Sequence, residues 1–226
     1  MPRLVLWDID HTLIDTRGVG RELSAAAFLQ TTGQVMRAQA KIDGITEPVI
    51  FRETAKLHGL STTRADFERF ARALTEEHLK RSAELRERGH ALPGAAAALD
   101  ALEDAAGIRQ TVVSGNIRPV SEIKLQVFGL DRNILWELGA YGEDNDVRAE
   151  LVRLCLRRAD AAVEEAVLIG DTPADVEGAH ANGVRVIAVA SGRSDEAALR
   201  DAGAEVVLSD LRDTEALVKL VRGDGQ

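Results

Sequence analysis

Two aspartates close the first apolar run of the chain. The segment LVLWDIDHTLIDT, residues 4–16, places Asp8 and Asp10 one residue apart, with Thr12 two positions further on. In an extended chain this spacing puts both carboxylates on the same side. Like charges at the end of a buried strand repel each other and are costly to bury, so the pair requires a cation, a proton or both.

Two other apolar runs also end in oxygen-bearing residues. Ser114-Gly115-Asn116 follows TVV (111–113), and Gly170-Asp171 follows AVLI (166–169), with Asp175 four residues after Asp171. At a single strand end such residues are usually turn or helix-capping residues. Three strand ends of this kind together favour a functional site instead, because ligands of open parallel sheets bind beyond the carboxyl ends of the strands.

The carboxylates of this predicted site indicate a hard cation. Asp8, Asp10 and Asp171 would bring three negative charges together, and Mg²⁺ is the divalent ion that prefers carboxylate and water oxygens. Zinc is not indicated, because the five histidines are scattered along the chain without ligand spacing. We therefore expect a Mg²⁺ site.

The apolar runs and the segments between them predict the fold class. Short runs rich in Val, Ile and Leu read as strands buried on both faces, and they continue at 184–190 and 205–208. Helical patterns alternate with them at 93–107, 120–130, 148–160 and 173–183. This alternation predicts right-handed βαβ units and an α/β fold with a doubly wound, Rossmann-like parallel sheet.

One region interrupts the alternation. Residues 17–89 contain no convincing strand and three helical segments, at 20–33, 46–59 and 63–89, the last with a partial apolar stripe formed by Phe67, Phe70, Leu74, Leu79 and Leu85. We interpret 17–89 as a small all-helical cap domain inserted after the first strand. Residues 1–16 and 90–226 then form the catalytic core.

Composition narrows the class of protein. The 226 residues carry 37 acidic and 28 basic side chains, a formal net charge of -9, and only 4% aromatic residues, so a nucleic-acid partner is not expected. No apolar stretch reaches membrane-spanning length, and the N-terminus lacks a signal-peptide pattern. The single Cys155 cannot form an intramolecular disulfide and is expected to be buried on a helix. We expect a cytoplasmic protein; composition leaves monomer and homodimer equally open.

The motifs resemble those of a known superfamily. Asp8-x-Asp10-x-Thr12, Ser114-Gly115-Asn116 and Gly170-Asp171-x-x-x-Asp175 look like motifs I, II and IV of the haloacid dehalogenase-like hydrolases. The resemblance extends over the core segments around these motifs. A helical insertion directly after motif I is similar to the C1 cap of the phosphoglycolate phosphatase-like members.

The resemblance implies a Mg²⁺-dependent phosphatase acting on a small phosphorylated metabolite. Asp8 would be the nucleophile that forms an aspartyl phosphate, and Asp10 the general acid and base. Ser114 and Thr12 would donate to the phosphoryl group, beside Gly115 and Asn116. Metal ligands would be Asp8, the backbone carbonyl of Asp10, and Asp171, with Asp175 orienting the metal's waters. Dehalogenases resemble this pattern without the second aspartate, so Asp10 argues for phosphoryl transfer.

Two positions depart from the superfamily pattern. His11 stands where glycine is usual, which brings a β-carbon into a tight turn. The Lys-Pro pair of motif III is absent, and Arg148 or Lys124 is left to supply the positive charge beside the nucleophile. A guanidinium does not mimic an ammonium closely, which weakens Arg148 as a substitute for the lysine. The alternatives are that Arg148 is a surface residue at a helix N-terminus and that Lys124 is a solvated lysine.

Substrate specificity is less readable. Asp43 and the following Gly44, Ile45 and Thr46 resemble the cap loop that contacts the leaving group in capped relatives, and Arg52 on the next helix could meet an acidic substrate. A phosphomutase of the same superfamily uses the same acid and base and stays open as an alternative. So does a non-catalytic Mg²⁺-binding scaffold, if no cation completes motif III. A dehydrogenase is excluded, because no G-x-G-x-x-G follows the first strand.

Overall fold

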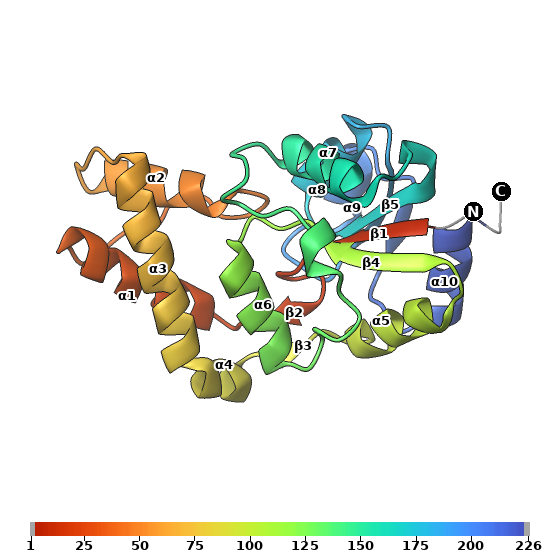
Figure 1. Ribbon diagram of the computed structural model, residues 1–226, viewed down its shortest axis with the longest axis horizontal. Helices are drawn as coiled ribbons and strands as arrows, with labels where there is room; N and C mark the ends of the chain where they lie inside the picture. Colours follow the sequence, from red (N-terminus) through yellow and green to blue (C-terminus); the bar gives the residue numbers. More distant parts are fainter. Residues whose placement is uncertain (1–2, 224–226) are drawn as a thin grey trace.

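A five-stranded parallel sheet forms the centre of the larger part of the molecule (Figure 1). The computed structural model describes residues 3–223. The strand order is β4-β1-β5-β6-β7, which places the first strand between the two others whose ends were predicted to carry the site. All five predicted strands are present. Their bounds are β1 Arg3–Trp7, β4 Ile108–Val112, β5 Ala166–Gly170, β6 Arg185–Val189 and β7 Val206–Leu208.

Helices cover both faces of the sheet, as a doubly wound fold requires. Val5 and Trp7 of β1 point to one face, where they pack with residues of the helices α5 and α10. Leu4 and Leu6 point to the other face, toward α7, α8 and α9. The bounds are α5 Ala95–Asp104, α6 Arg118–Val127, α7 Arg148–Ala159, α8 Pro173–His180, α9 Glu196–Asp201 and α10 Thr214–Arg222. Two 3₁₀ helices, Trp136–Leu138 and Val163–Glu165, lie in the connections.

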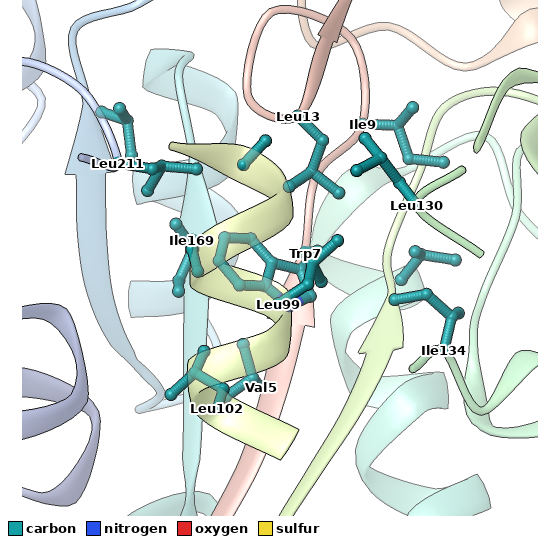
Figure 2. Close-up of a cluster of buried hydrophobic side chains, with 14 of the residues drawn as sticks. Val5, Trp7, Ile9, Leu13, Leu99, Leu102, Leu130, Ile134, Ile169 and Leu211 are labelled. Carbon is teal, nitrogen blue, oxygen red and sulfur yellow. The ribbon is translucent and has the colours of Figure 1, made fainter. Parts of the chain in front are cut away.

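Trp7 anchors the centre of the first of these two layers. Its indole ring lies among Leu99, Ile169 and neighbouring apolar side chains (Figure 2), and its Nε1–H donates to Gln110 Oε1 at 3.0 Å. Full burial of a large apolar side chain of this kind stabilises a fold by roughly 2–3 kcal/mol. The packing holds β1 rigidly where its carboxyl end delivers Asp8 to the site.

A helical cap stands apart from the sheet, beyond its carboxyl edge (Figure 1). It consists of α1 Val19–Thr32, α2 Glu47–Leu57, α3 Arg64–Lys80 and α4 Ser82–Arg88. Its own core is aromatic: Phe28, Phe51, Phe67 and Phe70 are buried together, and the Phe51 and Phe70 rings stack with centroids 4.5 Å apart. Residues of α6, including Val120, pack against this core.

The prediction of one long helix over 63–89 is wrong. The helix ends at Lys80 and a second begins at Ser82, because Arg81 adopts φ -109° and ψ 24°. The apolar stripe also differs from the prediction. Leu79 is 60% exposed, whereas His78, at the helical spacing from Leu74, is only 2% exposed.

A short antiparallel ribbon lies at the two ends of the cap. β2 (Ile14–Asp15) precedes the cap and pairs with β3 (His90–Ala91), which follows it. The boundary of the cap at residues 17–89 stays a prediction, and this ribbon is where we propose it. Within the described residues, no helix is both long and apolar enough to cross a membrane.

Candidate active site

The sheet order brings the three predicted strand ends to one edge. Trp7 is in register with Val112 of β4 on one side and with Ile169 of β5 on the other. The backbone N–H of Asp8 donates to the Ile169 carbonyl at 2.8 Å, which fixes where the side chain of Asp8 leaves the sheet. Residues that follow the three strands therefore meet in space, as expected from parallel strands.

A cavity of about 620 Å³ lies between this edge and the cap. Most of the predicted site residues line it, from both parts of the molecule. They are Asp8, Asp10, Gly44, Ile45, Ser114, Gly115, Asn116, Lys124, Arg148, Asp171 and Asp175. The volume is in the range of small-molecule sites.

Three buried carboxylates form the floor of the site. Asp8, Asp171 and Asp175 each offer an oxygen within 4.8 Å of the others. Burial, together with the neighbouring carboxylates, raises the pKa of Asp8 to about 7 and that of Asp171 to about 9. The arrangement thus favours either bound protons or a bound cation.

Arg148 supplies one positive charge to this group. Its Nη2 donates to Asp8 Oδ1 at 2.7 Å and also to Asp175 Oδ1, and the residue is only 8% exposed. Burial acts against the charge of Arg148, but Asp175 and Asp8 outweigh it and raise the pKa of the guanidinium. Arg148 is the first residue of α7, so the start of this helix brings it to Asp8.

Asp10 has a different cation. The Lys124 ammonium lies 2.8 and 2.7 Å from its two carboxylate oxygens, and Asn116 Nδ2 donates to Asp10 Oδ2 at 2.7 Å. Burial opposes ionisation of Asp10, but Lys124 and the Asn116 hydrogen bond prevail and lower its pKa. Asn116 also donates to Ser114 Oγ at 2.9 Å, so one hydrogen-bond network joins the ends of β1 and β4.

Both candidates for the missing motif III cation therefore reach the site. The sequence left Arg148 and Lys124 as alternatives, and the structure pairs Arg148 with Asp8 and Lys124 with Asp10. The two like-charged aspartates of the first strand are thus neutralised separately.

Three residues near the aspartates have structural contacts of their own. The Thr12 hydroxyl donates to Asp171 Oδ1 at 3.1 Å and lies 3.5 Å from Asp8 Oδ2, so it orients carboxylates and does not itself line the cavity. Asp175 also caps α8, because its Oδ2 accepts from the backbone N–H of Thr172 at 3.1 Å. His11 has φ 65°, the left-handed conformation that explains why glycine is usual at this turn.

The predicted cap loop touches the core. Gly44 has φ +69°, and a β-carbon there would overlap the Ala174 side chain of α8. A β-carbon on Gly115 would overlap the backbone carbonyl of Ile45. Thr46 is not in the cavity lining: its hydroxyl donates to the Asp146 carbonyl at 3.3 Å.

Arg52 also points elsewhere. It forms an exposed ion pair with Asp146 at 2.9 Å and is not among the residues that line the cavity.

The sequence reasoning missed several cavity residues from the cap. Glu47 and His78 line the interior, and Arg21 and Lys41, both exposed, also belong to the lining. Arg193, from the loop after β6, pairs with Asp43 at 3.5 Å across the junction. In the sequence, Arg21 and Glu47 have the appearance of ordinary helix-surface or helix-start positions, and Lys41 and Arg193 of ordinary loop cations. For His78, the only available signal was its place in the apolar stripe of α3.

The cluster of three carboxylates, Asp8, Asp171 and Asp175, fits a magnesium ion. The three side chains supply hard oxygen donors within reach of one cation, and Arg148 balances only part of their charge. The Asp10 carboxylate is committed to Lys124 and Asn116 and does not belong to this group. Its predicted role as a metal ligand would use its backbone carbonyl.

A family of known proteins matches most of the chain. The family described as haloacid dehalogenase-like hydrolase matches residues 5–180, and a second hydrolase model of the same type matches residues 147–214. No curated protein matches the chain by sequence.

Solved structures share the fold over nearly the whole chain. A hydrolase from Pseudomonas syringae has a TM-score of 0.70 at 20% identity, covering 97% of this chain and 99% of that one. A protein proposed to be a β-phosphoglucomutase, from Bacteroides vulgatus, has 0.68 at 18% identity, with 98% and 89% covered. A predicted phosphoglycolate phosphatase from Haemophilus somnus has 0.63 at 16% identity, with 95% and 97% covered. The match over residues 5–180 shows that this chain belongs to the haloacid dehalogenase-like hydrolase family.

Proposed function

We propose that the protein is a Mg²⁺-dependent phosphatase that hydrolyses a small-molecule phosphate monoester through a phosphoryl group on Asp8. The observation that carries this proposal is the presence of two aspartates in one cavity with separate cation partners. Asp8 pairs with Arg148 and lies close to the carboxylates of Asp171 and Asp175. Asp10 pairs with Lys124 and is joined to Ser114 through Asn116. One carboxylate can then act on phosphorus while the other manages protons.

We assign the role of nucleophile to Asp8, and its hydrogen bonds support this assignment. Arg148 holds its Oδ1 at 2.7 Å, whereas Oδ2 has only the long contact of 3.5 Å from Thr12. An oxygen with few hydrogen bonds keeps more of its nucleophilicity, and the fixed partner keeps the carboxylate oriented. Attack on phosphorus forms the Asp8–phosphate bond and breaks the bond from phosphorus to the ester oxygen.

We assign the proton transfers to Asp10. Its protonated form would donate to the leaving oxygen, and its carboxylate would then take a proton from the water that hydrolyses the phosphorylated Asp8. Lys124 and Asn116 favour the carboxylate form, which is the form needed for the second step. Ser114 Oγ accepts from Asn116, so its own hydrogen is free to point toward a phosphoryl oxygen.

Asp8, Asp171 and the Asp10 carbonyl would hold a magnesium ion, and Asp175 would orient its waters; when bound, the ion would supply positive charge against the phosphoryl oxygens. The core residues would otherwise present mostly negative charge to an anionic substrate. We therefore expect phosphatase activity to require the metal ion.

The test is an assay of purified protein on a panel of phosphate monoesters, with Mg²⁺ and with a chelator. We expect metal-dependent release of phosphate that is lost in Asp8→Asn. Turnover that persists in this variant would exclude Asp8 as nucleophile. Interconversion of sugar phosphates without net phosphate release would establish the mutase instead, and Mg²⁺ binding without any turnover would establish the scaffold.

A further inference from the structure

One ring nitrogen of a buried histidine in the cap half of the cavity lacks a hydrogen-bond partner. His78, on α3, is 2% exposed and lines the cavity. Its Nδ1 lies 2.8 Å from the Leu74 carbonyl, and because a carbonyl only accepts, Nδ1 carries the hydrogen. Its Nε2 then presents a lone pair, and no described residue donates to it.

Such an orphan atom is uncommon in the interior of a protein. Among the described residues, four buried side-chain atoms lack a partner, and those lining the cavity belong to His78 and Arg148. In Arg148 the atom without a partner is Nε, a donor, whereas its two aspartates accept from Nη2; the unpaired acceptor of the cavity lining is His78 Nε2. An unpaired buried acceptor costs free energy unless a ligand or water supplies the missing donor, so the position of His78 indicates a donor within the cavity.

Burial also keeps His78 an acceptor. It lowers the pKa of His78 to about 4, and the nearby positive charge of Lys124 acts in the same direction. The ring is therefore neutral at physiological pH. Ile50, Leu74 and Val120 also line the cavity, and their apolar side chains have no hydrogen to donate to His78 Nε2.

Glu47 adds a carboxyl group on this side. Burial raises its pKa to about 7, and in either protonation state it keeps an oxygen that can accept a hydrogen bond. It is the first residue of α2, its backbone N–H donates to the Gly115 carbonyl at 2.8 Å, and its carboxyl lies within electrostatic range of Lys124 and Asp10. The Lys124 ammonium is already bound to both oxygens of Asp10 and to Asn116 Oδ1. We call this part of the cavity lining, formed by His78, Glu47, Lys124, Ile50, Leu74 and Val120, the inner wall. The inner wall therefore offers hydrogen-bond acceptors and, among its described residues, no uncommitted cation.

Unpaired or weakly paired cations lie further out. Arg21 and Lys41 are exposed, and Arg193 is 63% exposed and faces Asp43. An anionic group on the leaving part of a substrate, placed against the inner wall, would lie near the negative charge of Asp10, and the Lys124 ammonium is already committed to Asp10 and Asn116. Hydroxyl groups at the same place would meet acceptors.

We propose that His78, assisted by Glu47, is a specificity-determining residue that accepts hydrogen bonds from hydroxyl groups of an uncharged leaving group. Esters of polyols or sugars are then preferred over esters of hydroxy acids. This inference rests on the proposed phosphatase function and names the substrate class that its site selects.

The test compares kcat/KM for three esters: sorbitol 6-phosphate, phosphoglycolate and p-nitrophenyl phosphate. The last is the reference, because its aryl group has no free hydroxyl that could donate a hydrogen bond. Wild type is expected to favour the polyol ester over phosphoglycolate by about tenfold or more, because a site built to pair a hydroxyl rejects a group that leaves it unpaired. His78→Leu should lower the ratio of polyol to aryl activity about tenfold, the value of one hydrogen bond. His78→Gln, which keeps an acceptor, should recover part of that ratio.

Leu79→Ala is the matched control, since Leu79 is the exposed neighbour on the same helix and should leave all three activities unchanged. A ratio that stays the same in His78→Leu, a preference of wild type for phosphoglycolate, or hydrolysis of the aryl ester without the polyol ester would overturn the inference while leaving the phosphatase intact. Failure of wild type to hydrolyse any of the three esters with Mg²⁺ would remove the proposed function and this inference with it.

Discussion

Replacement of Arg148 by methionine tests the electrostatic organisation of the site. The change keeps most of the apolar stem and removes the guanidinium from two buried carboxylates, whose side chains are 12% exposed in Asp8 and 1% exposed in Asp175. Removing one partner of a buried ion pair typically costs about 3–5 kcal/mol, because the remaining charge is left uncompensated. We expect a loss of that size in the free energy of unfolding at about pH 8.

The loss should shrink at low pH. Arg148 lowers the raised pKa of Asp8, so without Arg148 this pKa rises further, and the folded state binds more protons than the unfolded state in the range between the unfolded and folded pKa values of Asp8. A folded carboxyl with a raised pKa stabilises the fold at low pH, and this stabilisation is lost as pH rises through the folded value. Urea unfolding in a chelator, at about pH 5 and about pH 8, measures both values.

Arg153→Met is the control for this experiment. Arg153 lies on the same helix, is 54% exposed and pairs only with Glu150 on the surface, so its loss should change stability by no more than about 0.5 kcal/mol. A loss below about 1 kcal/mol in Arg148→Met at the higher pH would refute the reasoning, as would a loss equal at both pH values.

Three further predictions concern the metal and the proton path. Since the raised pKa of Asp171 makes protons compete with Mg²⁺, the rise in Tm on adding Mg²⁺ should be larger at about pH 8.5 than at about pH 6; an equal rise would contradict this. Lys124→Met should raise the pKa of Asp10. Because Asp10 must be protonated when the leaving group departs, the alkaline limb of the kcat/KM profile should move to higher pH, with activity reduced about 10²-fold; an alkaline limb that does not move would show that Lys124 does not control the protonation of Asp10. Gly192→Ala places a β-carbon against Asp171 Oδ2, so calorimetry should show Mg²⁺ affinity reduced roughly 10–100-fold; unchanged affinity would remove Asp171 from the metal ligands.

The sequence was sufficient for the parts of the site that the sheet controls. Strand periodicity and the polar residues after each strand predict that Asp8, Ser114 and Asp171 meet, because parallel strands deliver their carboxyl ends to one edge. That prediction needs no knowledge of how helices pack. The predicted strands, and their alternation with helices along the chain, are confirmed by the five-stranded parallel sheet.

The parts that depend on tertiary docking were not accessible in this way. Whether Lys124 reaches Asp10 depends on how α6 lies between the core and the cap, and sequence spacing does not determine that position. His78 has the helical spacing of a buried residue but a polar side chain, so its burial followed only from the packing of α3. Arg81 illustrates a local limit: its neighbourhood is rich in good helix formers, yet its backbone leaves the helix and its guanidinium binds Glu84 and Glu22.

The central claim is that Asp8 carries the phosphoryl group during turnover. The most direct test is mass spectrometry of protein quenched in acid during turnover of p-nitrophenyl phosphate with Mg²⁺, using wild type and Asp10→Asn, in which loss of the base slows hydrolysis of the intermediate. We predict an added mass of about 80 Da on the peptide containing Asp8, greater in Asp10→Asn and absent in Asp8→Asn. Phosphate release without any modified Asp8 in either protein, or a phosphoryl group on another residue, would contradict the account.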